Sequence, residues 1–364
     1  MTAVDRAVTG RPVREVLAAC RAEITPALRT AVDTLPGSVR RIAGYHFGWW
    51  DEHGEPTAAD GSGAGKALRP AVVLLAAEAV GGTPATGMPA VGTLAAGTPP
   101  AVVPAAVAVE LVHNFSLLHD DVMDSDRVRH HRATAWSVFG TSAAILAGDA
   151  LLALALDVLA ATGHPAAAKG VHMLAAAVHD LVEGQCADLA FEQRQDVSLA
   201  ECETMAAHKT GALLGCCGGI GALFAGARPE RIDRLRAFGC HLGTAFQDAD
   251  DLLGIWGDPA VTGKPIHSDL RSRKKTLPVV AALTSGNPAG RELAALYRTG
   301  PPLSDAELAR AAELVERAGG RSFCRDQADT HLGQALRELA GAEPAERAAA
   351  ELRALAHLAT RRDH

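Results

Sequence analysis

Three aspartates, Asp120, Asp121 and Asp124, end an apolar run in the stretch from Glu110 to Trp136. If this run is helical, Asp120 and Asp124 lie one turn apart on the same face, and Asp121 points about 100 degrees away from them. Carboxylates held this close repel one another unless a cation lies among them. Mg²⁺ favours oxygen ligands and shares its shell with water and phosphate. The spacing therefore predicts a magnesium site that also takes a diphosphate.

A second acidic group follows the same pattern. Gln247, Asp250 and Asp251 come near the end of a helical run within residues 246–258, which glycines then interrupt. Lysines and arginines follow each acidic group closely, as a site for a metal-bound diphosphate requires. One acidic helix end is often only a solvated surface, but two such ends in otherwise apolar helices have few structural explanations. The pair therefore favours a functional site.

Two basic signals are weaker. Lys66 and Arg69 lie in GKALRP, where a loop meets a helix and backbone amides can attract an anion. Lys209 lies inside a helical stretch. Basic side chains in such places are more often solvated than functional, so neither signal defines a site by itself.

Composition limits the class of protein. The chain has 364 residues, of which 48% are hydrophobic, and its formal net charge of −7 argues against a dedicated nucleic-acid binder. The seven cysteines show no CxxC pair or regular spacing, which predicts reduced thiols rather than a zinc ribbon or a disulfide framework. We see no signal core and no uninterrupted apolar run of membrane-spanning length. We therefore expect a cytoplasmic protein without a membrane span.

The elements that carry these groups are predicted to be helices. Alanine and leucine dominate, only 4% of the residues are aromatic, and alternating β-branched runs are scarce. These features favour an all-α fold, in a single domain over residues 1–364. We expect a helix over residues 11–35, broken or kinked at Pro26, and the carboxylate helix over residues 105–123.

Two segments near the first acidic group have unusual composition. Residues 143–161 are apolar almost all round, which predicts a helix buried in the middle of the protein, where Asp149 would need a partner. The Gly/Pro/Ala-rich segment at about 81–104 is predicted to be a flexible insertion.

Seven segments resemble, in order, motifs of the trans-prenyltransferase family, the isoprenyl diphosphate synthases. They are GKALRP, ELVHNFSLLHDDVMD, GDALL, GQCADL, HKTGALL, FQDADDLLGIWGD and TGKPIHSDLRSRKKTLP. The resemblance implies a large helical domain of isoprenoid synthase type around a deep central cavity, usually in a homodimer. It also implies the reaction. An allylic diphosphate ionises with the help of Mg²⁺, isopentenyl diphosphate attacks the cation, and loss of a proton leaves a longer chain.

The resemblance also assigns roles by position. It implies about three Mg²⁺ ions, with the carboxylates Asp120, Asp121, Asp124, Asp250 and Asp251 as ligands or their support. The positions that hold the allylic diphosphate carry Arg129, Lys209, Thr210, Gln247, Lys264 and Lys274. The positions that hold isopentenyl diphosphate carry Lys66, Arg69, His113 and His130. Lys209 and Lys264 join the acidic residues Asp120, Asp121, Asp124 and Asp250 as expected catalytic residues.

This chain departs from the family pattern at two informative positions. His130 stands where a second arginine is usual, and it donates fully to phosphate only when it is protonated. Gly254 stands where the second acidic motif usually has its third aspartate. A third carboxylate supports rather than leads in metal binding, so we expect its loss to be tolerated.

The same resemblance also implies the length of the isoprenoid product. The helix wall before the first acidic motif forms the floor of the product tunnel in this family, and bulky residues there stop growth. Phe115 lies five positions before Asp120 and is followed by the small Ser116, without a two-residue insertion between Asp121 and Asp124. This combination resembles enzymes that make geranylgeranyl diphosphate more than those that make farnesyl diphosphate.

Three other functions compete with chain elongation. A class I terpene cyclase on the same fold would leave Lys66, Arg69 and His113 without a role. A non-catalytic partner subunit of a heteromeric synthase would not need an intact first acidic motif. A metal-dependent phosphohydrolase would use His119 and Asp120 as a metal-binding pair, but the sequence lacks a well-placed upstream histidine ligand. The better expectation for His119 is a helix residue that makes a hydrogen bond around the metal ligands and does not bind the metal itself.

Overall fold

The computed structural model describes residues 10–57, 67–81, 101–129, 131–259, 265–298 and 303–360 of the chain. In these ranges the regular structure is helical apart from one two-stranded hairpin, which confirms the all-α prediction. The chain groups into two compact units. The first comprises Met1–Ala176, Cys216–Arg236 and Leu339–Leu355, and the second comprises Ala177–Gly215, Ala237–Glu338 and Ala356–His364. A single domain over the whole chain stays a prediction.

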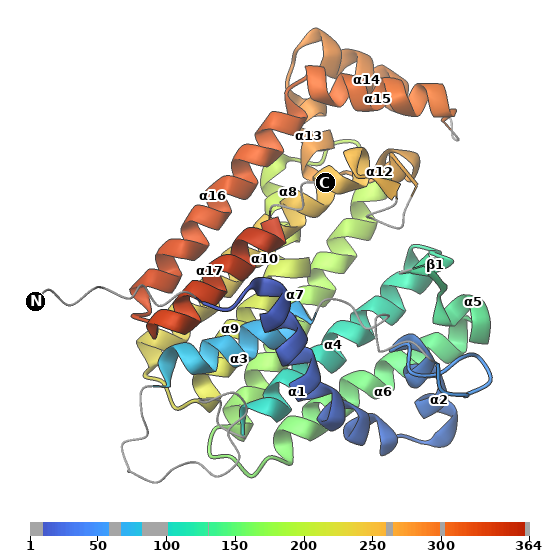
Figure 1. The fold of residues 1–364 in the computed structure, drawn as a ribbon. Coiled ribbons are helices and arrows are strands. Elements are labelled where there is room, and N and C mark those ends of the chain that lie inside the picture. The colour runs from blue at the N-terminus through green and yellow to red at the C-terminus, as the bar shows by residue number, and fades with distance from the viewer. Residues whose placement is uncertain are drawn as a thin grey trace, which may run out of the picture. The chain divides into compact units, whose positions relative to one another are not determined.

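The first unit carries the first acidic group on a core helix. Its elements are α1 (Val13–Asp33), α2 (Gly37–His46), α3 (Leu68–Val80), α4 (Val102–Met123), β1 (Val128–Arg129), β2 (Arg132–Ala133), α5 (Ala135–Phe139) and α6 (Thr141–Ala160). Helices α4 and α6 lie side by side, and α1 and α3 also pack against α4 (Figure 1). Buried side chains occupy every face of α4 from Ala105 to Val112, whereas beyond Ser116 only Leu118 and Asp121 are buried.

The second unit carries the second acidic group. It contains α8 (Leu199–Ala206), the π-helical turn η1 (Ala207–Gly211), α12 (Ser268–Arg271), α13 (Leu277–Thr284), α14 (Pro288–Arg298) and α15 (Asp305–Arg317). Longer helices contribute residues to both units: α7 (Ala167–Gln193), α9 (Ala212–Phe224), α10 (Pro229–Trp256), α16 (Gly320–Gly341) and α17 (Glu346–Thr360). Buried Leu293, Leu308 and Val315 belong to the hydrophobic core around α13, α14 and α15.

Helix α1 contains Pro26, where the sequence predicted a break or a kink. The helix continues through this proline without a break. Its buried residues are spaced at helical intervals on both sides of the proline: Val16, Cys20, Ile24, Leu28 and Val32. Packing of one apolar face therefore outweighs the hydrogen bond that proline removes.

Helix α6 is not buried on all sides, so that prediction was wrong. Leu146 is 60% exposed and Ile145 is 38% exposed, while Leu151 and Ala155 are fully buried. The side chain of Asp149 is 59% exposed and so escapes the cost of burial. The apolar composition of a helix therefore does not determine which of its faces are packed against the rest of the chain.

Helices α4 and α6 are each long and apolar enough to cross a bilayer. In α4, 78% of the apolar window is buried inside the protein, against 39% in α6. Core helices of soluble proteins meet the same criterion, so length and composition alone identify no span. The predicted insertion at about 81–104 falls, for residues 82–100, outside the described residues.

Candidate active site

The first acidic group lies at the C-terminal end of α4. The amide of Asp124 donates to the carbonyl of Asp120 at 2.8 Å, so the two residues are one helical turn apart, as predicted. Both are partly exposed. The negative end of the helix dipole disfavours further negative charge and favours a cation at this place. The carboxylates of Asp120 and Asp124 are therefore well suited to hold Mg²⁺.

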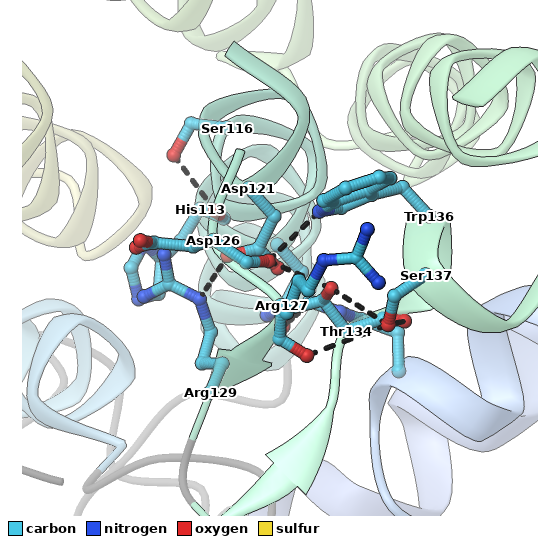
Figure 2. A network of polar contacts seen from close by, with 11 residues as sticks. His113, Ser116, Asp121, Asp126, Arg127, Arg129, Thr134, Trp136 and Ser137 are labelled. Atoms are coloured by element: carbon cyan, nitrogen blue, oxygen red, sulfur yellow. Dashed lines mark hydrogen bonds and ion pairs between the residues drawn. The ribbon is translucent and has the colours of Figure 1, made fainter. Parts of the chain in front are cut away.

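Asp121 has a different environment from these two residues. It is buried, and its Oδ1 accepts a hydrogen bond from Nε of Arg129 at 2.7 Å (Figure 2). Burial raises the pKa of Asp121 to about 6, although the guanidinium of Arg129 opposes the rise. The contact uses Nε of Arg129, so the two terminal nitrogens can point their N–H groups at another anion, such as a diphosphate. Asp121 thus orients a predicted substrate-binding residue.

The segment after α4 is held in place by its own hydrogen bonds. The side chains of Thr134 and Trp136 both donate to the carbonyl of Asp126 at 2.8 Å (Figure 2). Strands β1 and β2 form a hairpin in which Arg129 is paired with Arg132. These contacts fix the backbone from which Arg129 reaches Asp121. The hairpin is a short departure from the all-helical prediction.

Two residues predicted to bind isopentenyl diphosphate are in contact. Nη1 of Arg69, in the first turn of α3, lies 3.0 Å from Nε2 of His113 on α4. A guanidinium can only donate, so Nε2 of His113 accepts in this contact. The contact holds the guanidinium of Arg69 against α4, and its positive charge suits the diphosphate of isopentenyl diphosphate.

The second acidic group lies in the last three turns of α10. Asp250 is exposed, whereas Asp251 is buried. Oδ1 of Asp251 accepts from Nε2 of Gln247 at 2.8 Å, and Oδ2 accepts from the amide of Leu277 at 3.0 Å. Burial raises the pKa of Asp251 to about 7. Asp250 is thus the better placed metal ligand, and Asp251 joins α10 to the start of α13.

Lys209 and Thr210 lie in η1, where the backbone is π-helical instead of α-helical. Two glycines permit this geometry. A Cβ on Gly184 of α7 would lie 2.3 Å from the amide nitrogen of Lys209, and a Cβ on Gly243 of α10 would lie 2.6 Å from Cα of Gly211. The hydroxyl of Thr210 donates to Oε1 of Gln247 at 2.6 Å. π-Helical turns are frequent at functional sites. Here the turn places Thr210 next to Gln247, and both are predicted substrate-binding residues.

A residue without a predicted role, Asp188, joins two others. Its Oδ2 accepts from Nζ of Lys209 and lies 3.8 Å from Nζ of Lys274. Burial acts to raise the pKa of Asp188, but the two ammonium groups outweigh it and hold the pKa below its ordinary value. Its signal in the sequence is a carboxylate that interrupts the apolar pattern of α7. Asp188 thus holds two predicted diphosphate-binding lysines at one place.

The chain-length residues lie in the core of the first unit. Phe115 is 6% exposed and Ser116 is 9% exposed, and the hydroxyl of Ser116 donates to the carbonyl of His113 at 2.8 Å. Three predicted substrate-binding residues lie outside the described residues: Lys66, His130 and Lys264.

The donor set fits Mg²⁺ rather than a metal held entirely by protein. Within the described ranges no three histidine, cysteine or acidic side chains form a ready-made cage. Mg²⁺ uses one or two carboxylates together with substrate phosphates and water. When bound, such an ion would neutralise charge on a diphosphate. Asp120 and Asp124 are the residues of the first unit that would hold an ion, and Asp250 is the residue of the second unit that would do so.

Comparisons with known proteins identify the family. Residues 56–315 match the family described as polyprenyl synthetase. The chain is 46% identical over 337 residues to a (2E,6E)-farnesyl diphosphate synthase of Mycobacterium tuberculosis, covering 92% of this chain and 89% of that protein. It is 43% identical over 332 residues to a geranylgeranyl diphosphate synthase of the same bacterium, covering 90% and 88%. The solved polyprenyl synthetase of Streptomyces coelicolor A3(2) has a TM-score of 0.85 and 45% identity, covering 95% and 99%.

The chain belongs to the polyprenyl synthetase family, the trans-isoprenyl diphosphate synthases. Its helices form the isoprenoid synthase fold of its solved relative. It is a prenyltransferase that elongates isoprenoid chains. The two relatives carry names with different products, so family membership by itself does not assign the predicted geranylgeranyl product.

Proposed function

We propose that this synthase condenses an allylic diphosphate with isopentenyl diphosphate in the presence of Mg²⁺ and releases mainly geranylgeranyl diphosphate. The observation that carries the product assignment is Phe115, a large side chain buried in α4 five positions before Asp120. A ring at this depth ends the growing chain, while Ser116 beside it leaves room for several units. Bound Mg²⁺ supplies charge neutralisation of the leaving diphosphate, through Asp120, Asp124 and Asp250, with Asp121 and Asp251 in support.

The residues of the chain divide the work between the two substrates. Arg129, Lys209, Thr210, Gln247, Lys264 and Lys274 hold the allylic diphosphate. Its negative charge grows as the bond to carbon breaks, so cations aimed at it stabilise the transition state more than the ground state. Lys66, Arg69, His113 and His130 position isopentenyl diphosphate, which must not ionise. Apolar side chains around the hydrocarbon exclude water from the carbocation.

Farnesyl diphosphate is the second candidate product. The specific observation in its favour is the 46% identity to a relative named as a farnesyl diphosphate synthase. One incubation separates the two products: purified protein, Mg²⁺, isopentenyl diphosphate and, in turn, dimethylallyl, geranyl and farnesyl diphosphates. Conversion of farnesyl diphosphate to a longer diphosphate supports the geranylgeranyl assignment, and accumulation of farnesyl diphosphate from the shorter substrates contradicts it. A hydrocarbon or alcohol formed without isopentenyl diphosphate would instead point to a cyclase.

His130 is the residue to test for a role in binding isopentenyl diphosphate. Where related sequences carry arginine, a neutral imidazole donates only one hydrogen bond. We expect His130→Arg to lower the Michaelis constant for isopentenyl diphosphate and to leave that for the allylic substrate nearly unchanged. Equal Michaelis constants for isopentenyl diphosphate in both proteins would remove His130 from the acceptor site.

We further propose that the enzyme works as a cytoplasmic homodimer. Helix α6 carries two exposed apolar side chains, Ile145 and Leu146. They support the proposal because exposed apolar side chains can form a contact with a second copy of the chain. Light scattering on the purified protein measures the mass of the assembly directly, and a monomer at micromolar concentration would contradict the dimer.

A further inference from the structure

His119, directly before the first acidic group, connects α4 to α6. Its Nε2 lies 3.0 Å from the carbonyl oxygen of Ile145 and 3.6 Å from Oδ1 of Asp149, both on α6. A carbonyl oxygen can only accept, so Nε2 carries the proton and donates it to Ile145. Helix α6 therefore holds the imidazole in one orientation.

Gly148 makes room for this imidazole. A Cβ on Gly148 would lie 2.3 Å from Nε2 and 2.4 Å from Cδ2 of His119. Non-bonded carbon atoms approach favourably only to about 3.5–4.0 Å, so any side chain at position 148 displaces the ring. Glycine weakens a helix interior relative to alanine, and the close approach of His119 is the packing reason for its presence in α6.

The imidazole also packs against Phe115. The centroids of the two rings are 4.8 Å apart and their planes are at 69°, which is an edge-to-face contact. The two residues are four positions apart on α4 and so lie on the same face. A continuous row of contacts thus runs from Gly148 of α6 through His119 to Phe115.

We propose that His119, seated against Gly148, is a positioning residue that sets product length by holding the ring of Phe115. The proposal rests on the proposed function, in which Phe115 ends the growing chain. His119 acts through Phe115 and not on the substrate. When the imidazole is absent or displaced, Phe115 has room to rotate, and a chain that would have stopped there can take up another isopentenyl unit.

A cycle of three variants tests this row: His119→Ala, Gly148→Ala and the double substitution. Each is incubated with Mg²⁺, isopentenyl diphosphate and each allylic diphosphate, and the products are dephosphorylated and separated by length. We expect the ratio of the next longer product to the main product to rise roughly two- to tenfold in both single variants, the range that loss of one aromatic contact gives. In the double variant the methyl group at 148 meets no ring, so the ratio should equal that of His119→Ala alone.

A second readout distinguishes positioning from general damage. The kcat/KM of the first condensation should stay within about twofold of the wild type, because the row acts on where growth stops and not on the reacting atoms. Ala153→Ser, at an exposed position of α6, is the matched control and should keep the wild-type product pattern. If Gly148→Ala does not fold, His119→Ala, which only removes atoms, still gives the product test.

The outcomes separate the two proposals. An unchanged product pattern in active His119→Ala protein overturns the role of His119 and leaves chain elongation intact. The same conclusion follows if Gly148→Ala lengthens the product equally whether or not His119 is present. Wild-type protein that elongates no allylic diphosphate overturns the proposed function and this inference with it.

Discussion

The carboxylate of Asp269 occupies the space in which a side chain at position 254 would begin. A Cβ on Gly254 would lie 2.0 Å from Oδ2 of Asp269, which is far inside van der Waals contact. The hydroxyl of Ser268 donates to the carbonyl of Gly254 at 3.2 Å and ties α12 to the end of α10. The family pattern that this sequence resembles usually has a third aspartate at position 254. Here a carboxylate reaches the same point from α12.

Restoring the usual aspartate should therefore harm the enzyme. In Gly254→Asp the new side chain overlaps Asp269 and adds like charge, so we expect a loss of about 1–3 kcal/mol in the free energy of unfolding and a several-fold higher Mg²⁺ requirement. Gly254→Asp combined with Asp269→Gly removes the overlap and should recover both. Thermal unfolding measures the stability, and a Mg²⁺ titration of the elongation activity measures the Mg²⁺ requirement. Full stability and activity in Gly254→Asp would contradict this account.

The neighbours Asp250 and Asp251 should differ in what their loss affects. Asp251→Ala leaves the amide of Leu277 and the side-chain amide of Gln247 without their acceptor, so we expect a loss of about 1–3 kcal/mol in unfolding free energy. Asp250→Ala, at an exposed position, should change stability by less than about 0.5 kcal/mol and lower elongation far more than stability. Denaturant unfolding and steady-state kinetics check both. Equal stability of the two variants would reject the separation.

Asp188 should matter for the allylic substrate. Asp188→Asn removes the negative charge between Lys209 and Lys274, whose ammonium groups then repel one another and leave their positions. We expect kcat/KM for the allylic diphosphate to fall roughly tenfold or more, since a small misplacement of binding groups is costly. Asp196→Asn, an exposed carboxylate beyond the same helix, is the control. A normal kcat/KM in Asp188→Asn would exclude Asp188 from the site.

Local periodicity predicted much of the first acidic group. An apolar run that ends in Asp120 and Asp124 specifies a buried helix and one shared face, and the structure has both. The contact of Asp121 with Arg129 was not predictable, because a hairpin after the helix brings the guanidinium back. Hairpins this short leave almost no pattern in a sequence.

The second acidic group depended more on tertiary contacts. The spacing of Gln247, Asp250 and Asp251 indicated a helix end, but nothing local shows that Asp251 accepts from the amide of Leu277. The π-helical turn at Lys209 also escapes a pattern based on 3.6 residues per turn, since glycines on two other helices make it possible. The prediction that α6 is buried on all sides was wrong for a related reason. The apolar composition of a helix is a local property, whereas its burial depends on which other parts of the chain pack against it.

Glu351 joins α17 to Arg11. The side chain of Glu351 is fully buried and accepts three hydrogen bonds from Arg11, from its amide at 3.1 Å and from Nε and Nη2 at 2.9 Å each. Burial acts to raise the pKa of Glu351, but the hydrogen bonds and charge of Arg11 outweigh it and hold the pKa below its ordinary value. The folded state therefore binds fewer protons than the unfolded state at acidic pH.

This contact predicts a pH-dependent part of the stability. A lowered folded-state pKa stabilises the fold above the unfolded-state value, and the contribution is lost as the pH falls through the folded-state pKa. Glu351→Gln should thus lower the free energy of unfolding by about 1–3 kcal/mol at neutral pH, and the difference from the wild type should shrink below about pH 4. Denaturant unfolding from pH 3 to 8 measures it. Glu346→Gln, exposed on the same helix, should show a difference below about 0.5 kcal/mol at every pH, whereas a pH-independent loss in Glu351→Gln would mean that packing, not charge, stabilises this contact.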